Sequence, residues 1–270
     1  MFPYVADYDG YALRQWMIDN VDIAGYLSMM YLVLVWKGSI IADFLKDRGA
    51  TYKHFSLVFD RMGLGSLHPS QFGHSGGRPA LLKHIQRVGL ASGHCEREEA
   101  MTLTSPVGYW VGLFTLSKIP ELFDTVLLIM QCKQPPFLHW YHHVTVLVFA
   151  WHTFCEKSST MTVFVAMNLT VHSVMYFYFA LCACGLKRIM RNLAPLITTM
   201  QILQMVAGTA VTVFSAYVVY MEPAGMRCDV SLSNARMGVV VYASYLYLFS
   251  VFFARSYLWP KKDAAKIKGA

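Results

Sequence analysis

The 270-residue sequence predicts an all-α fold, a bundle of helices that crosses a membrane several times. Hydrophobic residues make up 56% of the chain, charged residues only 14%, and the mean hydropathy is +0.40, which excludes an ordinary soluble domain. Long apolar runs recur along the chain, most of them near the roughly 20 residues that cross a bilayer as a helix. We expect spans at about 23–45, 106–130, 137–154, 160–183, 193–220 and 237–259.

The sequence marks where some of these predicted spans begin. The first twenty residues carry acidic and polar groups and lack the continuous apolar segment of a cleavable signal peptide, so 23–45 is the first predicted span. The run at 137–154 is slightly short for a span, but Pro135 and Pro136 mark its start. No internal repeat or low-complexity tract divides the chain, which indicates one domain over residues 1–270.

Charged residues predict which ends of the spans face the cytosol. The lysine-rich tail at 261–268 and the loop 187–191 carry the positive charge typical of cytosolic segments, so we expect a cytosolic C-terminus. Acidic residues precede the first span and cluster at 96–99, which places both segments on the opposite side. Alternation of the spans then requires one more crossing between residues 46 and 99.

Residues 46–100 depart from the pattern of the other spans. Between residues 54 and 91 the chain is rich in glycine, serine and histidine and carries several charges, a composition typical of a loop. We therefore predict six clear spans with a degraded or missing seventh, which would be second in order. The alternative is a six-span protein whose first span is inverted relative to the charge rule.

Three histidines interrupt the predicted span at 137–154. His139, His142 and His143 are spaced i, i+3 and i+4, so their rings share one face of the helix. Titratable groups inside a bilayer are costly and usually face a protein-lined cavity or another polar group. The pattern predicts an inward-facing cluster. The alternative, above all for His139, is a helix end whose imidazoles meet water.

A second polar stripe lies in the preceding run, at 106–130. Lys118, Glu121 and Thr125 are spaced i, i+3 and i+7 along one helical face, and Asp124 lies at its edge. Three charges in so apolar a run are expected to point inward and to pair there. For Lys118 and Glu121, the alternative is a buried ion-pair network that only locks the register of the helices.

The run at 160–183 also carries a polar face at helical spacing. Its members are Asn168, His172, Met175, Tyr176 and Phe179. A lone histidine in such a place is often a hydrogen-bonded core residue. Because a second helix of the same chain carries histidines, however, His172 is a candidate to meet them at one reacting carbon.

Two glutamines mark the run at 193–220. Gln201 and Gln204 lie three residues apart and so share a helical face. They either contact a substrate or act as polar contacts between helices.

These stripes together resemble the ELO family of fatty-acid elongases, membrane enzymes of very-long-chain fatty-acid synthesis. Four family motifs match in order: Lys118-x-x-Glu121-x-x-Asp124-Thr125, His139-x-x-His142-His143, Asn168-x-x-x-His172-x-x-Met175-Tyr176-x-Tyr178 and Thr198-x-x-Gln201-x-x-Gln204. Phe179 stands where the family usually has a second tyrosine. The resemblance covers 106–260 well but not 46–100, since the family has seven helices and an apolar second one. A local frameshift or a damaged gene copy would explain that departure.

The resemblance implies a condensing enzyme that joins acyl-CoA to malonyl-CoA and releases 3-ketoacyl-CoA, CO2 and free CoA, without a cofactor or a metal. His142 would be the nucleophile and His172 would stabilise the oxyanion or carry protons, with His139 and His143 completing the catalytic group. Supporting residues would be Lys118, Glu121, Asp124, Thr125, Asn168, Met175, Tyr176, Gln201 and Gln204. The helices would enclose an apolar tunnel for the acyl chain.

The resemblance also bears on substrate and location. Trp140 and Tyr141 between the histidines resemble the branch that acts on saturated and monounsaturated chains. The ending Lys266-Ile-Lys268-Gly-Ala matches a K-x-K-x-x retrieval signal, so we expect a multi-pass protein of the endoplasmic reticulum membrane. Expected partners are acyl-CoA, malonyl-CoA, the bilayer, and the ketoacyl reductase, dehydratase and enoyl reductase of the elongation cycle, with no nucleic acid.

Basic residues on the predicted cytosolic side suit the phosphates of CoA by charge attraction. The candidates are Lys133, Lys187, Arg188 and Arg191. The alternative is the positive-inside rule, which needs no ligand.

Two other functions share some of these features. A membrane di-iron desaturase or hydroxylase also carries an HxxHH box, but such enzymes use about eight histidines in three boxes, and here only one box occurs. The six cysteines show no paired C-x-x-C spacing for a metal either. A non-enzymatic receptor or transporter would use buried charge for ligand or ion passage. Polar stripes on three consecutive predicted spans favour chemistry.

Overall fold

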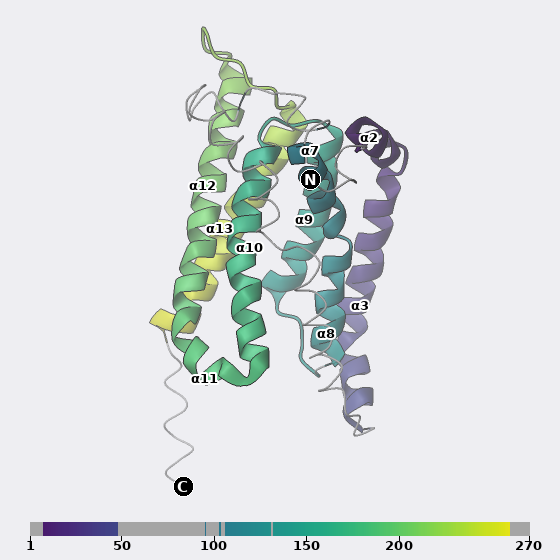
Figure 1. Ribbon diagram of the computed structural model, residues 1–270, viewed down its shortest axis with the longest axis vertical. Coiled ribbons are helices and arrows are strands. Elements are labelled where there is room, and N and C mark those ends of the chain that lie inside the picture. The colour runs from purple at the N-terminus through teal and green to yellow at the C-terminus, as the bar shows by residue number, and fades with distance from the viewer. Residues whose placement is uncertain (1–7, 48–94, 96–102, 104–105, 131, 260–270) are drawn as a thin grey trace.

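The computed structural model describes residues 8–47, 95, 103, 106–130 and 132–259. Every regular element in these residues is helical, and the long helices run side by side (Figure 1). The first half contains α2 (Gly10–Asp19), α3 (Val21–Asp47), α7 (Pro106–Ser117), the 3-10 turn η2 (Pro120–Leu122) and α8 (Phe123–Met130). The second half contains α9 (Phe137–Cys155), α10 (Met161–Leu181), η3 (Cys182–Leu186), α11 (Lys187–Met190), η4 (Arg191–Leu193), α12 (Ala194–Met221), α13 (Leu232–Phe253) and η5 (Ala254–Leu258).

The prediction of an all-α membrane bundle is confirmed, but the count of spans is lower than expected. Within the described residues, four helical stretches are long and apolar enough to cross a membrane: Val21–Phe44, Met161–Leu181, Cys184–Met221 and Leu232–Leu258. Of the two other predicted spans, 106–130 is broken into α7, η2 and α8, and 137–154 forms the 19-residue α9 with its three histidines. Pro120 breaks the first of these two runs, and the histidines make the second less apolar than the four spans.

The break between α7 and α8 has a local cause. Pro120 has no amide hydrogen, so the α-helical pattern of hydrogen bonds ends before it and resumes at Phe123. The exposed backbone groups are satisfied within the break. Lys118 N donates to Thr115 O at 3.3 Å, and the Ser117 hydroxyl donates to Phe114 O at 2.7 Å. Such a break at membrane depth is tolerated where the freed groups find partners in the protein.

The two ends of the bundle can be named by their helices. Loops 156–160 and 222–231 lie at the end that carries α2, while residues 132–136 and 182–193 lie at the opposite, α11 end (Figure 1). α3 and α7–α8 both run from the α2 end to the α11 end, and from α8 onward the long helices alternate in direction. Asp47 closes α3 at the α11 end. Cys95 lies at the α2 end, where its carbonyl accepts a hydrogen bond from Asp229 N at 2.8 Å. The expected second span falls at 48–94, outside the described residues.

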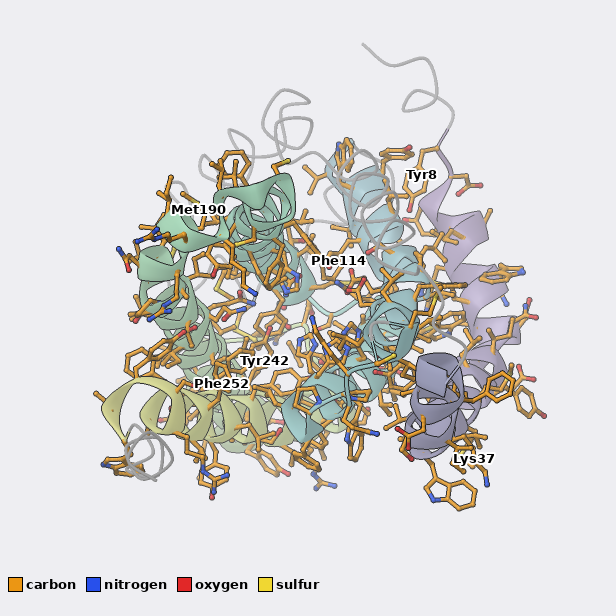
Figure 2. The ribbon with its side chains drawn as sticks, turned by 90° about the horizontal axis from the view of Figure 1, so that it is seen from below. Tyr8, Lys37, Phe114, Met190, Tyr242 and Phe252 are labelled. Atoms are coloured by element: carbon orange, nitrogen blue, oxygen red, sulfur yellow. A yellow bond between two sulfur atoms is a disulfide. The ribbon has the colours of Figure 1, made fainter. Side chains whose placement is uncertain are left out.

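Two clusters of buried side chains hold the helices together. The first joins α2, α3, α7, α9 and α10 around Trp151, whose indole nitrogen donates to Met17 O at 2.9 Å and so fixes α2 on α9. The second joins α9, α10, α12 and α13 around Tyr242. Figure 2 shows Tyr242 and Phe114 on the inward sides of their helices and Lys37 on the outer surface. A Cβ at position 208 would collide with the Tyr242 ring, so Gly208 permits the close approach of α12 and α13.

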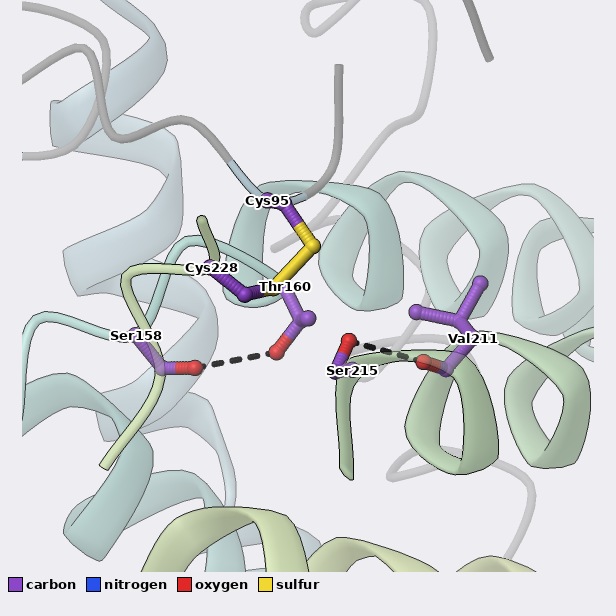
Figure 3. Close-up of a disulfide and its surroundings, with 6 residues drawn as sticks. All are labelled: Cys95, Ser158, Thr160, Val211, Ser215 and Cys228. Atoms are coloured by element: carbon purple, nitrogen blue, oxygen red, sulfur yellow. Dashed lines mark hydrogen bonds between the residues drawn. A yellow bond between two sulfur atoms is a disulfide. The ribbon is translucent and has the colours of Figure 1, made fainter. Parts of the chain in front are cut away.

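A disulfide joins Cys95 to Cys228 at the α2 end of the bundle (Figure 3). The two cysteines are 133 residues apart, and no spacing in the sequence predicts the pair. Asp229 extends the contact, since its carbonyl accepts a hydrogen bond from Ser159 N at 3.1 Å. The disulfide therefore ties the chain just before α7 to the loop between α12 and α13 and to the loop before α10.

We predict that Cys95→Ala and Cys228→Ala each lower the free energy of unfolding by about 2–5 kcal/mol, because the bond closes a long loop. Thermal unfolding of the solubilised protein measures this. The double variant should be no less stable than the less stable single variant, since both remove the same bond. If the two losses of unfolding free energy add in the double variant, the two cysteines do not form one disulfide.

Candidate active site

The three histidines of α9 form one cluster on the inward side of the helix. The ring of His143 lies 4.4 Å from that of His139 and 5.7 Å from that of His142 between centroids. His143 is 7% exposed, and its Nδ1 has no hydrogen-bond partner among the described residues. His139 and His142 are only partly buried, so some open space reaches them. The spacing therefore predicted correctly that the three side chains lie together.

A fourth histidine reaches this cluster from the neighbouring helix. His172 of α10 faces His142 with a centroid distance of 6.4 Å and ring planes inclined by only 23°. His172 also lies 5.8 Å from the ring of Tyr176, one turn along α10, and Tyr176 is close enough to Asp124 for a side-chain hydrogen bond. The predicted convergence of two imidazoles from different helices is thus present in the structure.

The helix break places an ion pair beside the histidines. Lys118 Nζ lies 2.7 Å from Glu121 Oε1, and the Ser117 hydroxyl donates to the same oxygen at 3.1 Å. Lys118 is only 2% exposed and its ammonium lies 4.0 Å from the centroid of the Phe114 ring, a cation–π contact. The ammonium is also near enough to interact electrostatically with His142 and His172. The pair is therefore buried and adjacent to the imidazoles.

A chain of hydrogen bonds connects α3, α8 and α9 through Thr125. The Thr125 hydroxyl lies 2.9 Å from His139 Nε2 and 2.6 Å from the hydroxyl of Tyr31, and Thr125 is fully buried. His139 is therefore held by a protein partner, which contradicts the alternative of an imidazole that simply meets water. Tyr31 was not among the predicted residues, because a single tyrosine in an apolar run carries no signal of a polar role.

The remaining motif residues lie on α10 and α12. Gln201 Nε2 lies 3.3 Å from the sulfur of Met175, a contact between α12 and α10 that favours the role of a polar link between helices. Gln204 is buried on α12, and Asn168 is buried on α10 one turn from His172, toward the α2 end.

The four basic candidates for CoA binding are exposed and lie at the α11 end, away from the histidines. Lys133 lies in the segment between α8 and α9, and the others lie between α10 and α12. The two segments occupy the same end of the bundle (Figure 1). The structure thus gathers the candidates at one end, as the charge pattern predicted.

Two further residues at the site carried no signal in the sequence. The ring of Tyr245, on α13, lies 5.0 Å from that of His142, and its hydroxyl lies 2.6 Å from that of Thr145, on α9. Tyr245 sits among other aromatic residues of an apolar run, where a core residue is the ordinary interpretation. In the described part of the chain, no group of three or more His, Cys, Asp or Glu side chains is arranged to hold a metal ion.

The ELO family, described as the GNS1/SUR4 family, matches residues 16–265. The chain belongs to the ELO family. It is 57% identical to fatty acid elongase 2 of Trypanosoma brucei brucei (strain 927/4 GUTat10.1), over 99% of this chain and 100% of the relative. It is 52% identical to fatty acid elongase 2 of Trypanosoma cruzi (strain CL Brener), over 98% of this chain and 97% of the relative. No solved structure matches it.

A third relative is fatty acid elongase 1 of Trypanosoma brucei brucei (strain 927/4 GUTat10.1), which is 46% identical over 95% of this chain and 88% of its own length. The family match begins at residue 16 and therefore takes in the segment 46–100 as well as 106–260. All four motifs, from Lys118 to Gln204, fall inside the matched range.

We predict that Lys118→Met lowers the stability of the protein by about 3–5 kcal/mol, because it leaves the Glu121 carboxylate without its ion partner in the interior. The double variant Lys118→Met, Glu121→Leu should recover most of this loss, since it removes both charges. Thermal unfolding of the solubilised variants measures both effects. Activity of the double variant separates the two interpretations of the pair. If the double variant regains both stability and full activity, the ion pair serves only to fix the register of the helices.

Proposed function

We propose that this ELO-family protein is the condensing enzyme of fatty-acid elongation, which joins acyl-CoA to malonyl-CoA and forms 3-ketoacyl-CoA through an acyl group carried on His142. Membership of the family and relatives named fatty acid elongases support elongation. The observation that carries the chemistry is the approach of His142 and His172 from two helices, with their rings 6.4 Å apart. The protein does not fully enclose the imidazole of His142 or of His172, because both side chains are only partly buried.

The first half of the reaction transfers the acyl group to the enzyme. A neutral imidazole nitrogen of His142 attacks the thioester carbonyl, the C–S bond breaks, and CoA leaves as a thiolate that takes up a proton. His172, on the neighbouring helix α10, accepts the remaining ring proton of the acyl-imidazolium and passes it to the departing thiolate. An acyl-imidazole is a reactive acyl donor, so one difficult step becomes two easier ones.

The second half forms the carbon–carbon bond. Malonyl-CoA loses CO2, and the carbanion left at its α-carbon attacks the acyl carbonyl on His142. The bond between that carbonyl and the imidazole nitrogen then breaks, which releases 3-ketoacyl-CoA and returns His142 to its neutral form once a proton is restored. His172 is placed to donate a hydrogen bond or a proton to the oxyanion that forms in each half.

The other motif residues orient these two imidazoles. Thr125 fixes the ring of His139 at 2.9 Å, and His139 in turn packs against His143. Lys118 supplies positive charge near both reacting imidazoles, where negative charge develops on the substrate. Hydrogen-bonded neighbours of this kind set the tautomer and the angle of a ring.

The substrate's two ends fit two different parts of the bundle. We expect the phosphates of CoA to bind the basic residues Lys133, Lys187, Arg188 and Arg191 at the α11 end, and the acyl chain to occupy the apolar tunnel that the family resemblance implies. The condensation itself includes no reduction and no dehydration, so its 3-keto product must be reduced and dehydrated by other enzymes. We therefore propose that a ketoacyl reductase, a dehydratase and an enoyl reductase act on the product.

We propose that the protein resides in the endoplasmic reticulum membrane with its α11 end and its C-terminus in the cytosol. The Cys95–Cys228 disulfide at the α2 end supports this orientation, because disulfides persist in the oxidising lumen and are rare in the cytosol. Lys266 and Lys268, which match the retrieval signal, lie outside the described residues.

We predict that His142→Ala abolishes condensation while the protein is still made and inserted. With acyl-CoA alone, intact mass measurement of the wild type should show one acyl adduct, which disappears in the variant and on addition of malonyl-CoA. His152→Ala is the matched control, because His152 lies ten residues along the same helix and contacts Ser233 of α13 at the α2 end. An adduct on Cys132, a free cysteine between α8 and α9, or an active His142→Ala variant would overturn the assignment.

We predict that replacing both Lys266 and Lys268 with serine releases a tagged protein to later compartments of the secretory route. The motivation is the K-x-K-x-x ending on a cytosolic tail. Light microscopy of cells that express the two forms measures the change, and Lys261→Ser, Lys262→Ser is the control for loss of two tail charges. An unchanged reticular distribution of the double variant would contradict the retrieval signal.

A further inference from the structure

The C-terminal helix α13 contacts the histidine cluster through one residue that belongs to none of the four motifs. Tyr245 is 4% exposed, and its ring lies 5.0 Å from the ring of His142 with the two planes inclined by 42°. The other neighbours of the His142 ring are His143 at 5.7 Å, on its own helix, and His172 at 6.4 Å. Among the described residues, the ring of Tyr245 therefore lies closest by centroid distance to that of the proposed nucleophile.

The hydroxyl of Tyr245 adds a second contact, to the backbone that carries the nucleophile. It lies 2.6 Å from Thr145 Oγ1 and donates toward His142 O at 3.4 Å. The Thr145 hydroxyl also reaches Tyr141 O at 2.6 Å and His142 O at 3.3 Å. Tyr245 thus contacts residue 142 both at its ring and at its carbonyl, whereas an ordinary core tyrosine would need only one buried partner for its hydroxyl.

A separate bond holds α13 in this place. The Tyr141 hydroxyl donates to Ser244 Oγ at 3.0 Å, and the ring of Tyr141 meets that of Tyr245 edge to face at 6.2 Å. The contact between α9 and α13 is therefore polar as well as apolar at this level of the bundle. Polar contacts between membrane helices limit sliding and rotation of one helix against the other.

We propose that Tyr245 is a positioning residue that fixes the orientation of the His142 imidazole during acyl transfer. This proposal rests on the proposed role of His142 as the nucleophile. An imidazole turns about two side-chain bonds, and the Tyr245 ring blocks rotation to one side while its hydroxyl helps to hold the backbone from which the ring projects. Because the tyrosine hydroxyl is already engaged with Thr145, it acts through His142 and not on the substrate.

Such a role affects the chemical step more than the binding of substrate. A misplacement of about 1 Å in a reacting group can lower a rate by about 100-fold. The CoA-binding candidates lie at the α11 end, on other segments, so loss of Tyr245 leaves them in place. We expect kcat and the rate of adduct formation to fall while KM for both CoA substrates stays within about twofold.

Three variants test the proposal in the full-length protein in membranes or detergent. Tyr245→Phe keeps the ring and removes the hydroxyl, and should lower kcat by roughly 3–10-fold, the effect of one neutral hydrogen bond. Tyr245→Leu removes the ring as well and should lower kcat by roughly 100-fold. Tyr242→Phe is the matched control for loss of a buried α13 hydroxyl, because Tyr242 packs on Phe164 and Phe149 and the variant keeps its ring, including the edge contact with Tyr245 at 6.4 Å. It should retain kcat.

A double-mutant cycle with Thr145 separates positioning from general loss of stability. Thr145→Val and Tyr245→Phe remove the two partners of one hydrogen bond, so their effects on the rate of adduct formation should be less than additive. The thermal midpoint and the rate of adduct formation on His142 are measured for every variant. In a purely structural role the fraction of folded enzyme would fall, whereas here the rate per folded molecule falls.

The outcomes distinguish this proposal from the proposed function. If the wild type forms no adduct on His142, the proposed function fails, whatever the variants do. If the wild type forms the adduct and Tyr245→Leu forms it at the wild-type rate per folded molecule, the positioning role is overturned. It is also overturned if Tyr245→Phe and Thr145→Val slow the reaction in a fully additive way. A slower adduct with unchanged KM and less than additive effects supports the proposal.

Discussion

The buried ion pair between Lys118 and Glu121 is the constraint on which the rest of the site depends. A charge inside a membrane bundle needs a partner, and here the two partners lie three residues apart at a break in a helix. Pro120 makes the break, and the Ser117 hydroxyl lies within hydrogen-bond distance of both a freed carbonyl and the carboxylate of Glu121. With its charge paired, the ammonium of Lys118 can remain only 2% exposed beside the imidazoles. Without the pair, the polar interior would carry an uncompensated charge.

The rest of the polar interior follows the same rule, in that hydrogen bonds cross from one helix to the next. Tyr31, Thr125 and His139 connect α3, α8 and α9, and Thr145 meets Tyr245 of α13. Two apolar clusters pack around these contacts. One involves α2, α3 and α7, and the other involves α12 and α13. Both clusters include residues of α9 and α10. The helices that carry the two facing histidines therefore stand between the clusters and are fixed from both sides.

The sequence was a good guide to residues that share a helix and a poor guide to their partners on other helices. Helical periodicity predicted that His139, His142 and His143 lie together, because that contact is local. Tyr31 and Tyr245 escaped prediction because only the packing of distant helices makes them polar partners of the histidines. The same holds for the disulfide, whose cysteines are 133 residues apart. Among the described residues the span count was too high because Pro120 breaks the run at 106–130 and the histidines of α9 make the run at 137–154 less apolar.

The depth of the histidines explains why the basic residues lie apart from them. At 1.5 Å per residue, His142 lies about 8 Å from the start of α9 at Phe137, and His172 lies about 14 Å from the end of α10. Exposed charges at the α11 end are hydrated, whereas phosphates carried to the depth of His142 would lose their water at great cost. In the proposed reaction the long, uncharged arm of CoA spans this distance. Its phosphates remain with the basic residues, and only the thioester enters the part of the bundle where Lys118, His142 and His172 act on it.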